Sequence, residues 1–100
     1  MKFYLINGSF RPDMPQGPAF KEALEAHHAY WAPYMQKGEV LVSGPKVGGA
    51  GLLLLKCEDD ADVQAIMDAD PFVSGGVAEF VAMEFNPFYA HPDAAAFFGK

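Results

Sequence analysis

Short stretches of alternating or continuous hydrophobic residues, separated by glycine, proline and asparagine, predict four β-strands. Each stretch is rich in leucine, valine, phenylalanine or tyrosine, and each is followed by a turn signal such as Asn7-Gly8 or Gly44-Pro45. The glycines between residues 48 and 51 predict a hairpin turn, because no Gly-Lys-Ser/Thr of a phosphate-binding loop follows them. The predicted strands span residues 2–7, 40–43, 52–57 and 77–85.

Two segments have helical periodicity instead. The first, over residues 19–37, places apolar and aromatic side chains on one face at spacings of four and three. Pro33 removes the hydrogen bond to the carbonyl of Ala29, so we expect a kink or a break there. The second helix begins with a cap at Asp59 or Asp60 and runs through Ala69, since Asp70-Pro71 ends it. The stripe of the first helix contains Phe20, Leu24, His27, Trp31 and Tyr34.

The order of these elements is β-α-β-β-α-β, the ferredoxin-like α+β arrangement, with a four-stranded antiparallel sheet and both helices on one face. The other face should then be polar, yet the run of leucines at 52–55 is apolar on both sides. The last predicted strand likewise has Val81, Met83 and Phe85 on one side and Phe80 on the other. We therefore expect a homodimer through the sheet face.

Composition narrows the class of protein. The 100 residues predict a single domain, 1–100, and 51% hydrophobic residues are enough for a core. With 13 acidic against 7 basic residues and a net charge of −6, binding to nucleic acid or to an acidic membrane surface is not expected. A lone cysteine, Cys57, no signal peptide and no long apolar segment favour a cytoplasmic protein.

Two polar residues fall on inward-facing stripes. His27 shares the stripe of the first helix, whereas its neighbour His28 aligns with Lys21 and Glu25 and should face solvent. Asp70 follows Val63, Ile66 and Met67 on the inward stripe of the second helix, in a last turn where the helix dipole disfavours a carboxylate. The alternative is that His27 is a hydrogen-bonded core residue and that Asp-Pro simply opens a turn.

An inward histidine and an inward carboxylate suggest a catalytic pair. Asp70 would fix the tautomer of the ring, and His27 would move the proton. A nucleophile is not apparent, because the serines lack an elbow motif and acidic neighbours disfavour the Cys57 thiolate. No clustered spacing of His27, Asp70 and His91 supports a metal site, and no cofactor motif is present.

Two sets of residues resemble the YCII-related family. The similarity extends from about Met1 to Phe88. The first set comprises His27-x-x-Tyr30-Trp31-x-x-Tyr34-x-x-x-Gly38-x-Val40-Leu41-x-Ser43-Gly44-Pro45, and the second comprises Asp68-Ala69-Asp70-Pro71-Phe72-Val73-x-x-Gly76-Val77 with a strand that ends in Asn86-Pro87-Phe88.

This resemblance implies a ferredoxin-like dimer, a dimeric α/β barrel, with His27 and Asp70 as the polar pair of its site. Two features depart from the family. Many relatives carry an arginine at the position of Leu24, so this protein must use another cation, such as Arg11 or Lys46, or bind something less charged. The tail over 89–100 extends beyond the usual family end, and we expect its Phe97 and Phe98 to cover the dimer or the pocket mouth.

The leading functional hypothesis is a cofactor-free isomerase- or lyase-type enzyme for a small organic molecule, acidic or aromatic-derived. The alternative is a non-catalytic dimer, in which the same pair is a buried hydrogen bond that joins the two helices. A small-molecule sensor lies between the two. The expected pocket wall consists of Tyr30, Trp31, Ser43, Gly44, Pro45 and Phe72.

Overall fold

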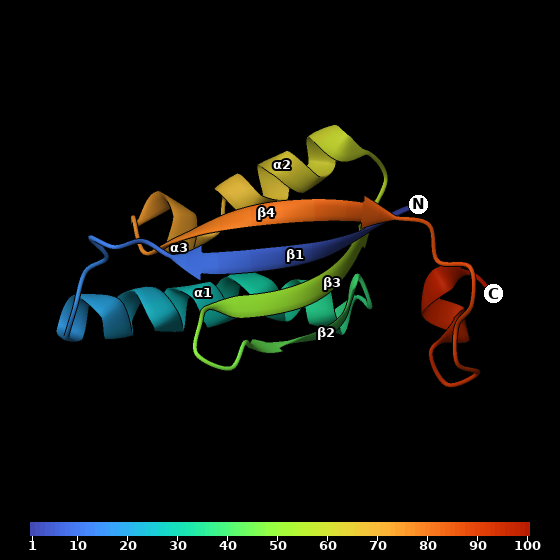
Figure 1. The fold of residues 1–100 in the computed structure, drawn as a ribbon, viewed down its shortest axis with the longest axis horizontal. Helices are drawn as coiled ribbons and strands as arrows, with labels where there is room; N and C mark the ends of the chain where they lie inside the picture. Colours follow the sequence, from blue (N-terminus) through green and yellow to red (C-terminus); the bar gives the residue numbers. More distant parts are fainter.

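The computed structural model describes all 100 residues, arranged as one sheet, its covering helices and a C-terminal tail (Figure 1). The predicted order of strands and long helices is confirmed. The elements are β1 (Lys2–Phe10), α1 (Pro18–Gln36), β2 (Val40–Pro45), β3 (Gly51–Cys57), α2 (Asp60–Asp68), α3 (Pro71–Ser74), β4 (Ala78–Phe85) and a 3₁₀ helix, η1 (Ala95–Phe98).

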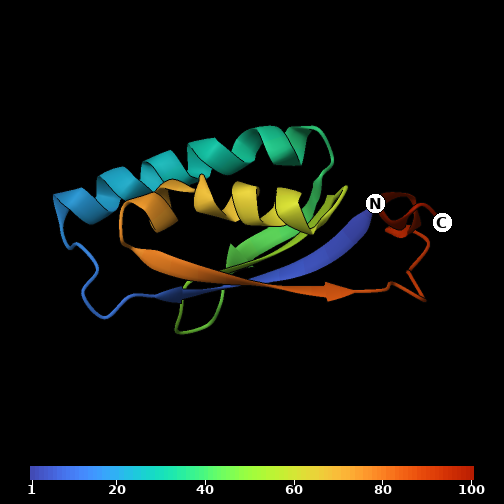
Figure 2. The same ribbon diagram turned by 90° about the horizontal axis from the view of Figure 1, so that it is seen from above.

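The sheet is antiparallel throughout, with strand order β2-β3-β1-β4. Leu5 of the central strand β1 lies between Leu54 of β3 and Met83 of β4, so the first and last strands of the chain are neighbours in the sheet. α1, α2 and α3 all lie on one face of this sheet, as the view from above shows (Figure 2). The fold is therefore the ferredoxin-like α+β arrangement.

Of the kink or break expected at Pro33, the break does not occur, because helix α1 continues through it to Gln36. The proline removes one hydrogen bond, but the next turn closes normally, with Lys37 N–H donating to the Pro33 carbonyl at 3.0 Å. Trp31 is buried in the core before the proline, and Tyr34 packs against the same cluster after it. Packing on both sides keeps the helix continuous.

The region around Asp70 also differs from the prediction. α2 ends at Asp68, and Asp70 caps a separate short helix, α3, by accepting a hydrogen bond from Phe72 N–H. Its carboxylate therefore sits at the start of a helix and not in the last turn of one, so the expected unfavourable dipole position is wrong. Strands β1 and β2 are longer than predicted and run on to Phe10 and Pro45.

The core lies between the helices and one face of the sheet. Alternate residues of each strand point into it, and Ile6 and Leu55 are almost completely inaccessible. The opposite face carries apolar side chains that nothing in the monomer covers, among them Val81 at 67% and Met83 at 63% exposure.

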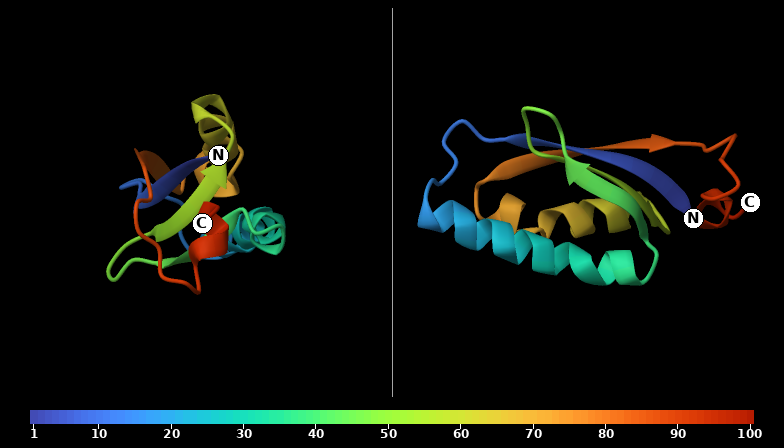
Figure 3. Two further views of the ribbon diagram at one scale, coloured as in Figure 1. Left: turned by 90° about the vertical axis from the view of Figure 1, so that its right-hand side faces the viewer. Right: turned by 90° about the horizontal axis from the view of Figure 1, so that it is seen from below.

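The C-terminal tail packs at the end of the sheet where both termini lie (Figure 3). Phe97 and Phe98 contact Phe3, with ring centroids 6.0 and 5.2 Å away. Lys56 Nζ donates to the Phe97 carbonyl at 3.0 Å and lies over its ring. The tail aromatics therefore contact β1 and β3 and do not cover the pocket described below, so that part of the prediction is wrong. None of the helices has the length and apolar character needed to cross a membrane.

Candidate active site

The Asp70 carboxylate is completely buried, and three N–H groups surround it. Trp31 Nε1 donates to Oδ2 at 2.7 Å, and the backbone N–H of Phe72 donates to Oδ1 at 2.8 Å. His27 Nδ1 lies 2.8 Å from Oδ2 and 2.9 Å from Oδ1. An ionised carboxylate only accepts hydrogen bonds, so three donors suit that form. The same side chain thus connects α1 with the start of α3.

His27 is held by one ring nitrogen and has the other one free. Its Nδ1 faces Asp70, whereas Nε2 makes no hydrogen bond within the protein. No buried side-chain nitrogen or oxygen lacks a partner, so Nε2 is accessible to solvent. The imidazole stacks on Phe72 with centroids 4.0 Å apart and planes 8° from parallel. Donation from Nδ1–H to Asp70 leaves the Nε2 lone pair free to accept a proton.

His27 opens onto a pocket of about 650 Å³ between α1 and the β2–β3 hairpin. This volume is within the range of small-molecule sites. The lining is mostly apolar and aromatic, and Leu53 and Ala50 form buried parts of its wall. α1 contributes one long side, including Phe20, Leu24, His27 and Trp31, and the hairpin contributes Ser43, Gly44, Pro45, Gly49, Gly51 and Leu52.

Most of the pocket residues expected from the sequence line this pocket. Trp31, Ser43, Gly44, Pro45 and Phe72 all do, together with His27. Asp70 lies directly behind His27 and does not reach the pocket surface.

Tyr30 is the exception, and its placement in the pocket wall is wrong. Its hydroxyl donates to the Ile66 carbonyl of α2 at 2.8 Å, and its ring lines a more open groove of about 920 Å³ on the other side of α1. One helical position is a rotation of 100°, so Tyr30 and Trp31 face different neighbours although they are adjacent in sequence. Burial, and then the hydrogen bond with Tyr34, raises the pKa of Tyr30 above its usual range. It is therefore not a ready proton donor near neutral pH.

Several lining residues were missed at the sequence level. Phe20 was on the predicted inward stripe of α1 but was not included in the expected pocket wall. Phe10 lies beyond the predicted end of the first strand at residue 7, whereas in the structure β1 runs on to Phe10. Phe80 lies so close to Gly8 that a Cβ there would meet its ring at 2.6 Å.

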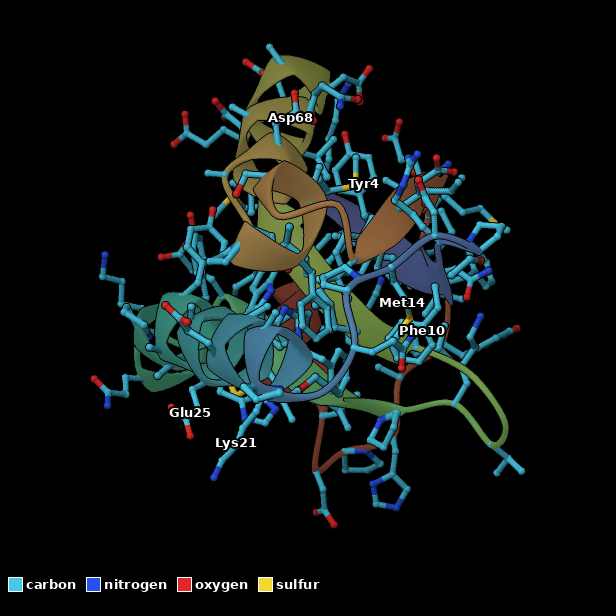
Figure 4. All side chains as sticks on the ribbon, turned by 90° about the vertical axis from the view of Figure 1, so that its left-hand side faces the viewer. Tyr4, Phe10, Met14, Lys21, Glu25 and Asp68 are labelled. Atoms are coloured by element: carbon cyan, nitrogen blue, oxygen red, sulfur yellow. The ribbon has the colours of Figure 1, made fainter.

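His28 also reaches the pocket rim although it is exposed, as predicted. Lys21 and Glu25, on the same predicted stripe, project from α1 away from the sheet (Figure 4). His28 therefore lies at the edge of the solvent-facing side of α1, next to the pocket.

The remaining perturbed groups belong to structural contacts. Burial, followed by the nearby carboxylates of Asp62 and Asp59, raises the pKa of the Cys57 thiol to about 11. Burial and the hydrogen bond to Asp60 raise the pKa of the Tyr4 phenol, and the same bond lowers the pKa of Asp60. None of the three lines the His27 pocket. No group of three or more histidine, cysteine, aspartate or glutamate side chains is placed to hold a metal ion.

The comparisons with known proteins agree with this geometry at the level of the fold. The solved structure of 5-chloro-2-hydroxyhydroquinone dehydrochlorinase from Burkholderia phenoliruptrix, in complex with 2,5-dihydroxybenzoquinone, is similar with a TM-score of 0.66 and 22% identity. The similarity covers 91% of this chain and 96% of that one, and at this identity it shows a shared fold. No curated protein matches the sequence. The family model of the YCII-related domain matches residues 2–86, and the chain therefore belongs to the YCII-related family.

Proposed function

We propose that this protein is a cofactor-free enzyme of the lyase or isomerase type, in which His27 moves a proton on a small organic molecule. Nε2 is the base, and the pocket beside it holds the substrate. Asp70 keeps Nδ1 protonated and stabilises the imidazolium that forms when Nε2 accepts a proton. His27 is the catalytic residue, and Asp70 is a positioning residue.

In the lyase form of this step, Nε2 takes a proton from a C–H or O–H bond of the substrate. The electron pair of that bond becomes a new π bond, and a leaving group departs with its own bonding pair. In the isomerase form, the imidazolium returns the proton to another atom of the same molecule. Both forms are balanced without an oxidant, a metal or a second substrate.

One observation carries the proposal: a histidine that lines a largely apolar pocket has Nδ1 fixed by a buried carboxylate and Nε2 without a protein partner. A histidine that serves only the core would have partners for both nitrogens. The structural neighbour supports the reaction class, since its name describes a dehydrochlorinase of a small aromatic compound.

The test is chloride release from 5-chloro-2-hydroxyhydroquinone under anaerobic conditions, followed with a chloride electrode. We expect release above the buffer rate, with a loss of about 10²-fold or more in the His27→Gln variant, the size typical of general base catalysis. His91→Gln is the matched control, because His91 is exposed in the tail and far from the pocket lining. Release that survives His27→Gln, or no release from the wild type, would contradict the proposal.

A second candidate function, a non-catalytic module that binds a small molecule or links subunits, rests on the architecture of Asp70. This side chain caps α3 and holds Trp31, roles that need no chemistry. Under that alternative no reaction rate depends on His27, and the pair contributes only to stability. The chloride assay of His27→Gln beside the wild type separates the two functions, and a urea titration verifies that the variant is folded.

We also propose that the protein is a homodimer through the uncovered face of the sheet. The supporting observation is the row of exposed apolar side chains on the strands there, made up of Leu5, Leu52, Val81, Met83 and Phe85. Such a surface is unusual for a monomer and typical of an interface. Met83→Glu should then give a monomer in sedimentation velocity. Val47→Glu, at the fully exposed hairpin tip, should leave the dimer intact. A wild type that sediments as a monomer would disprove this part.

A further inference from the structure

We infer that the His27 pocket selects an uncharged, planar ring and rejects carboxylates. This inference rests on the proposed function, whose substrate it specifies. It concerns binding alone, so it can be tested without turnover. The relevant observations are the charge of the lining, the position of the nearest cations and the shape of the walls.

The lining has no fixed charge. Of the 18 residues that line the pocket, none is lysine, arginine, aspartate or glutamate, and only His27 and His28 can ionise. Burying a carboxylate in such surroundings removes its hydration and supplies no permanent positive partner, which is costly. An uncharged hydroxylated ring loses much less hydration. It can still exchange hydrogen bonds with His27 Nε2 and with Ser43 at the rim.

The two cations that the sequence offered as anion partners are occupied elsewhere. Arg11 contacts the carboxylate of Glu79 on β4 at 2.8 Å and that of Asp13 in its own loop at 3.3 Å. Lys46 donates to the side-chain oxygen of Asn7 at 2.7 Å. Neither residue lines the pocket. With a net charge of −6, the chain as a whole also repels anions. A less charged ligand is the option that remains.

The walls favour a flat molecule. Phe20 and Phe72 are stacked with centroids 6.1 Å apart, and Phe10 meets Phe20 edge to face at 6.0 Å. These rings and Trp31 offer aromatic surface on which another ring can pack. The hairpin adds three glycines and an alanine beside Ser43, Pro45, Leu52 and Leu53, so part of its lining has little or no side chain and leaves room beside the aromatic rings.

The test compares two ligands of nearly equal shape that differ in charge, gentisamide and gentisate. Binding is measured by calorimetry and by the indole N–H signal of Trp31 in a nitrogen–proton correlation spectrum. Trp31 is the only tryptophan, so its signal needs no assignment, and its N–H bonds to Asp70 beside the pocket. We expect gentisamide to bind at least about tenfold more tightly than gentisate. Phenol should likewise shift the signal more than cyclohexanol at equal concentration.

A variant tests the cause. Leu24→Arg places a cation on the pocket wall and should reverse the preference, so that gentisate binds more tightly than gentisamide. Leu24→Met, of similar volume, should keep the wild-type order, and the spectrum verifies that both variants are folded. Equal or tighter binding of gentisate by the wild type would overturn the inference, and so would the absence of binding by both ligands.

The same measurements keep the inference separate from the proposed function. Preferential binding of gentisamide without any His27-dependent turnover would support the inference about ligand charge and contradict the proposed enzymatic function. His27-dependent turnover of a carboxylate substrate would support the proposed enzymatic function and contradict the inference about ligand charge.

Discussion

The two sides of helix α1 both carry polar and aromatic groups but differ in composition and bonding. On one side, His27 and Trp31 both bond to Asp70, and His27, which lines an apolar pocket, keeps one ring nitrogen without a protein partner. On the other side, the Tyr30 hydroxyl donates to the Ile66 carbonyl and lies beside Tyr34, in a groove with lysines, glutamates and an aspartate around it.

The difference distinguishes a candidate ligand-binding site from a hydrogen-bonded contact that only holds two helices together. A polar group whose bonding capacity is used up holds two elements together and has nothing left for a ligand. A polar group with one position free, next to a surface that water leaves readily, can bind or react. The larger volume of the groove beside Tyr30 is therefore a poorer guide to function than the free nitrogen of His27.

Among substitutions on the two sides of α1, the largest expected effect is on the rate of turnover. His27→Gln should lower the rate of the proposed proton transfer by about 10²–10⁴-fold, and Tyr30→Phe should leave it unchanged. The free energy of unfolding should fall by less than about 1 kcal/mol in His27→Gln, because the glutamine amide can donate to Asp70 in place of Nδ1. Parallel rate assays and urea titrations measure both quantities. Equal rate losses in the two variants would erase the contrast between the two sides.

The next effect is on stability. Asp70→Ala should lower the free energy of unfolding by about 2–4 kcal/mol, since it leaves the buried donors of Trp31 and Phe72 unpaired and removes the α3 cap. Asp68→Ala is the matched control on the preceding helix. It loses only an exposed bond to Gln64 and should change stability by less than about 0.5 kcal/mol.

Asp70→Asn gives a milder version of the same test if the alanine variant does not fold. The amide keeps the size of the side chain and one acceptor oxygen, so a loss smaller than that of alanine is expected. Chemical denaturation of all three variants gives the ranking. An Asp70→Ala variant as stable as the Asp68→Ala control would mean that the buried carboxylate does not hold α1 and α3 together.

A smaller effect is expected on the Tyr30 side. Tyr30→Phe removes the bond to the Ile66 carbonyl and should cost about 1 kcal/mol of stability. Binding of gentisamide in the His27 pocket should not change, because the Tyr30 ring does not line it. Calorimetry on the folded variant checks this, and a clear loss of affinity would show that the two sides of α1 are coupled.

The smallest effect concerns Cys57 in the same groove. With its pKa raised to about 11, the thiol is mostly protonated at moderately alkaline pH, and iodoacetamide should react with the folded protein at least about tenfold more slowly than with the urea-unfolded chain. Rapid alkylation of the folded chain would contradict the burial of this side chain.

The same shift affects stability at high pH. The thiol of the unfolded chain loses its proton near the ordinary value of 9.0, before the folded protein does. Its contribution to stability should therefore decline as the pH rises from about 9 towards about 11. Replacement of Cys57 by alanine should remove that part of the slope in pH-dependent denaturation.

Residue periodicity and turn signals were sufficient to predict the order of the elements. The inward position of His27 followed from the stripe of the first helix, which is a local property of the chain. Asp70 was inferred from the stripe of the second helix, although the structure places it after α2, as the cap of α3. The break that Pro33 could cause is absent, because core packing of Trp31 and Tyr34 outweighs the local signal. Tyr30 was expected in the pocket wall, but only its neighbour Trp31 lines the pocket.

The sequence by itself therefore determined which elements form and which of their faces turn inward, because both depend on neighbours a few positions away. Tertiary structure alone decided what those faces meet. It placed Trp31 on the Asp70 carboxylate, brought Phe10 and Phe80 to the pocket, and bound Arg11 to Glu79 and Lys46 to Asn7. Such contacts join residues tens of positions apart, and their distances depend on how the sheet and the helices pack.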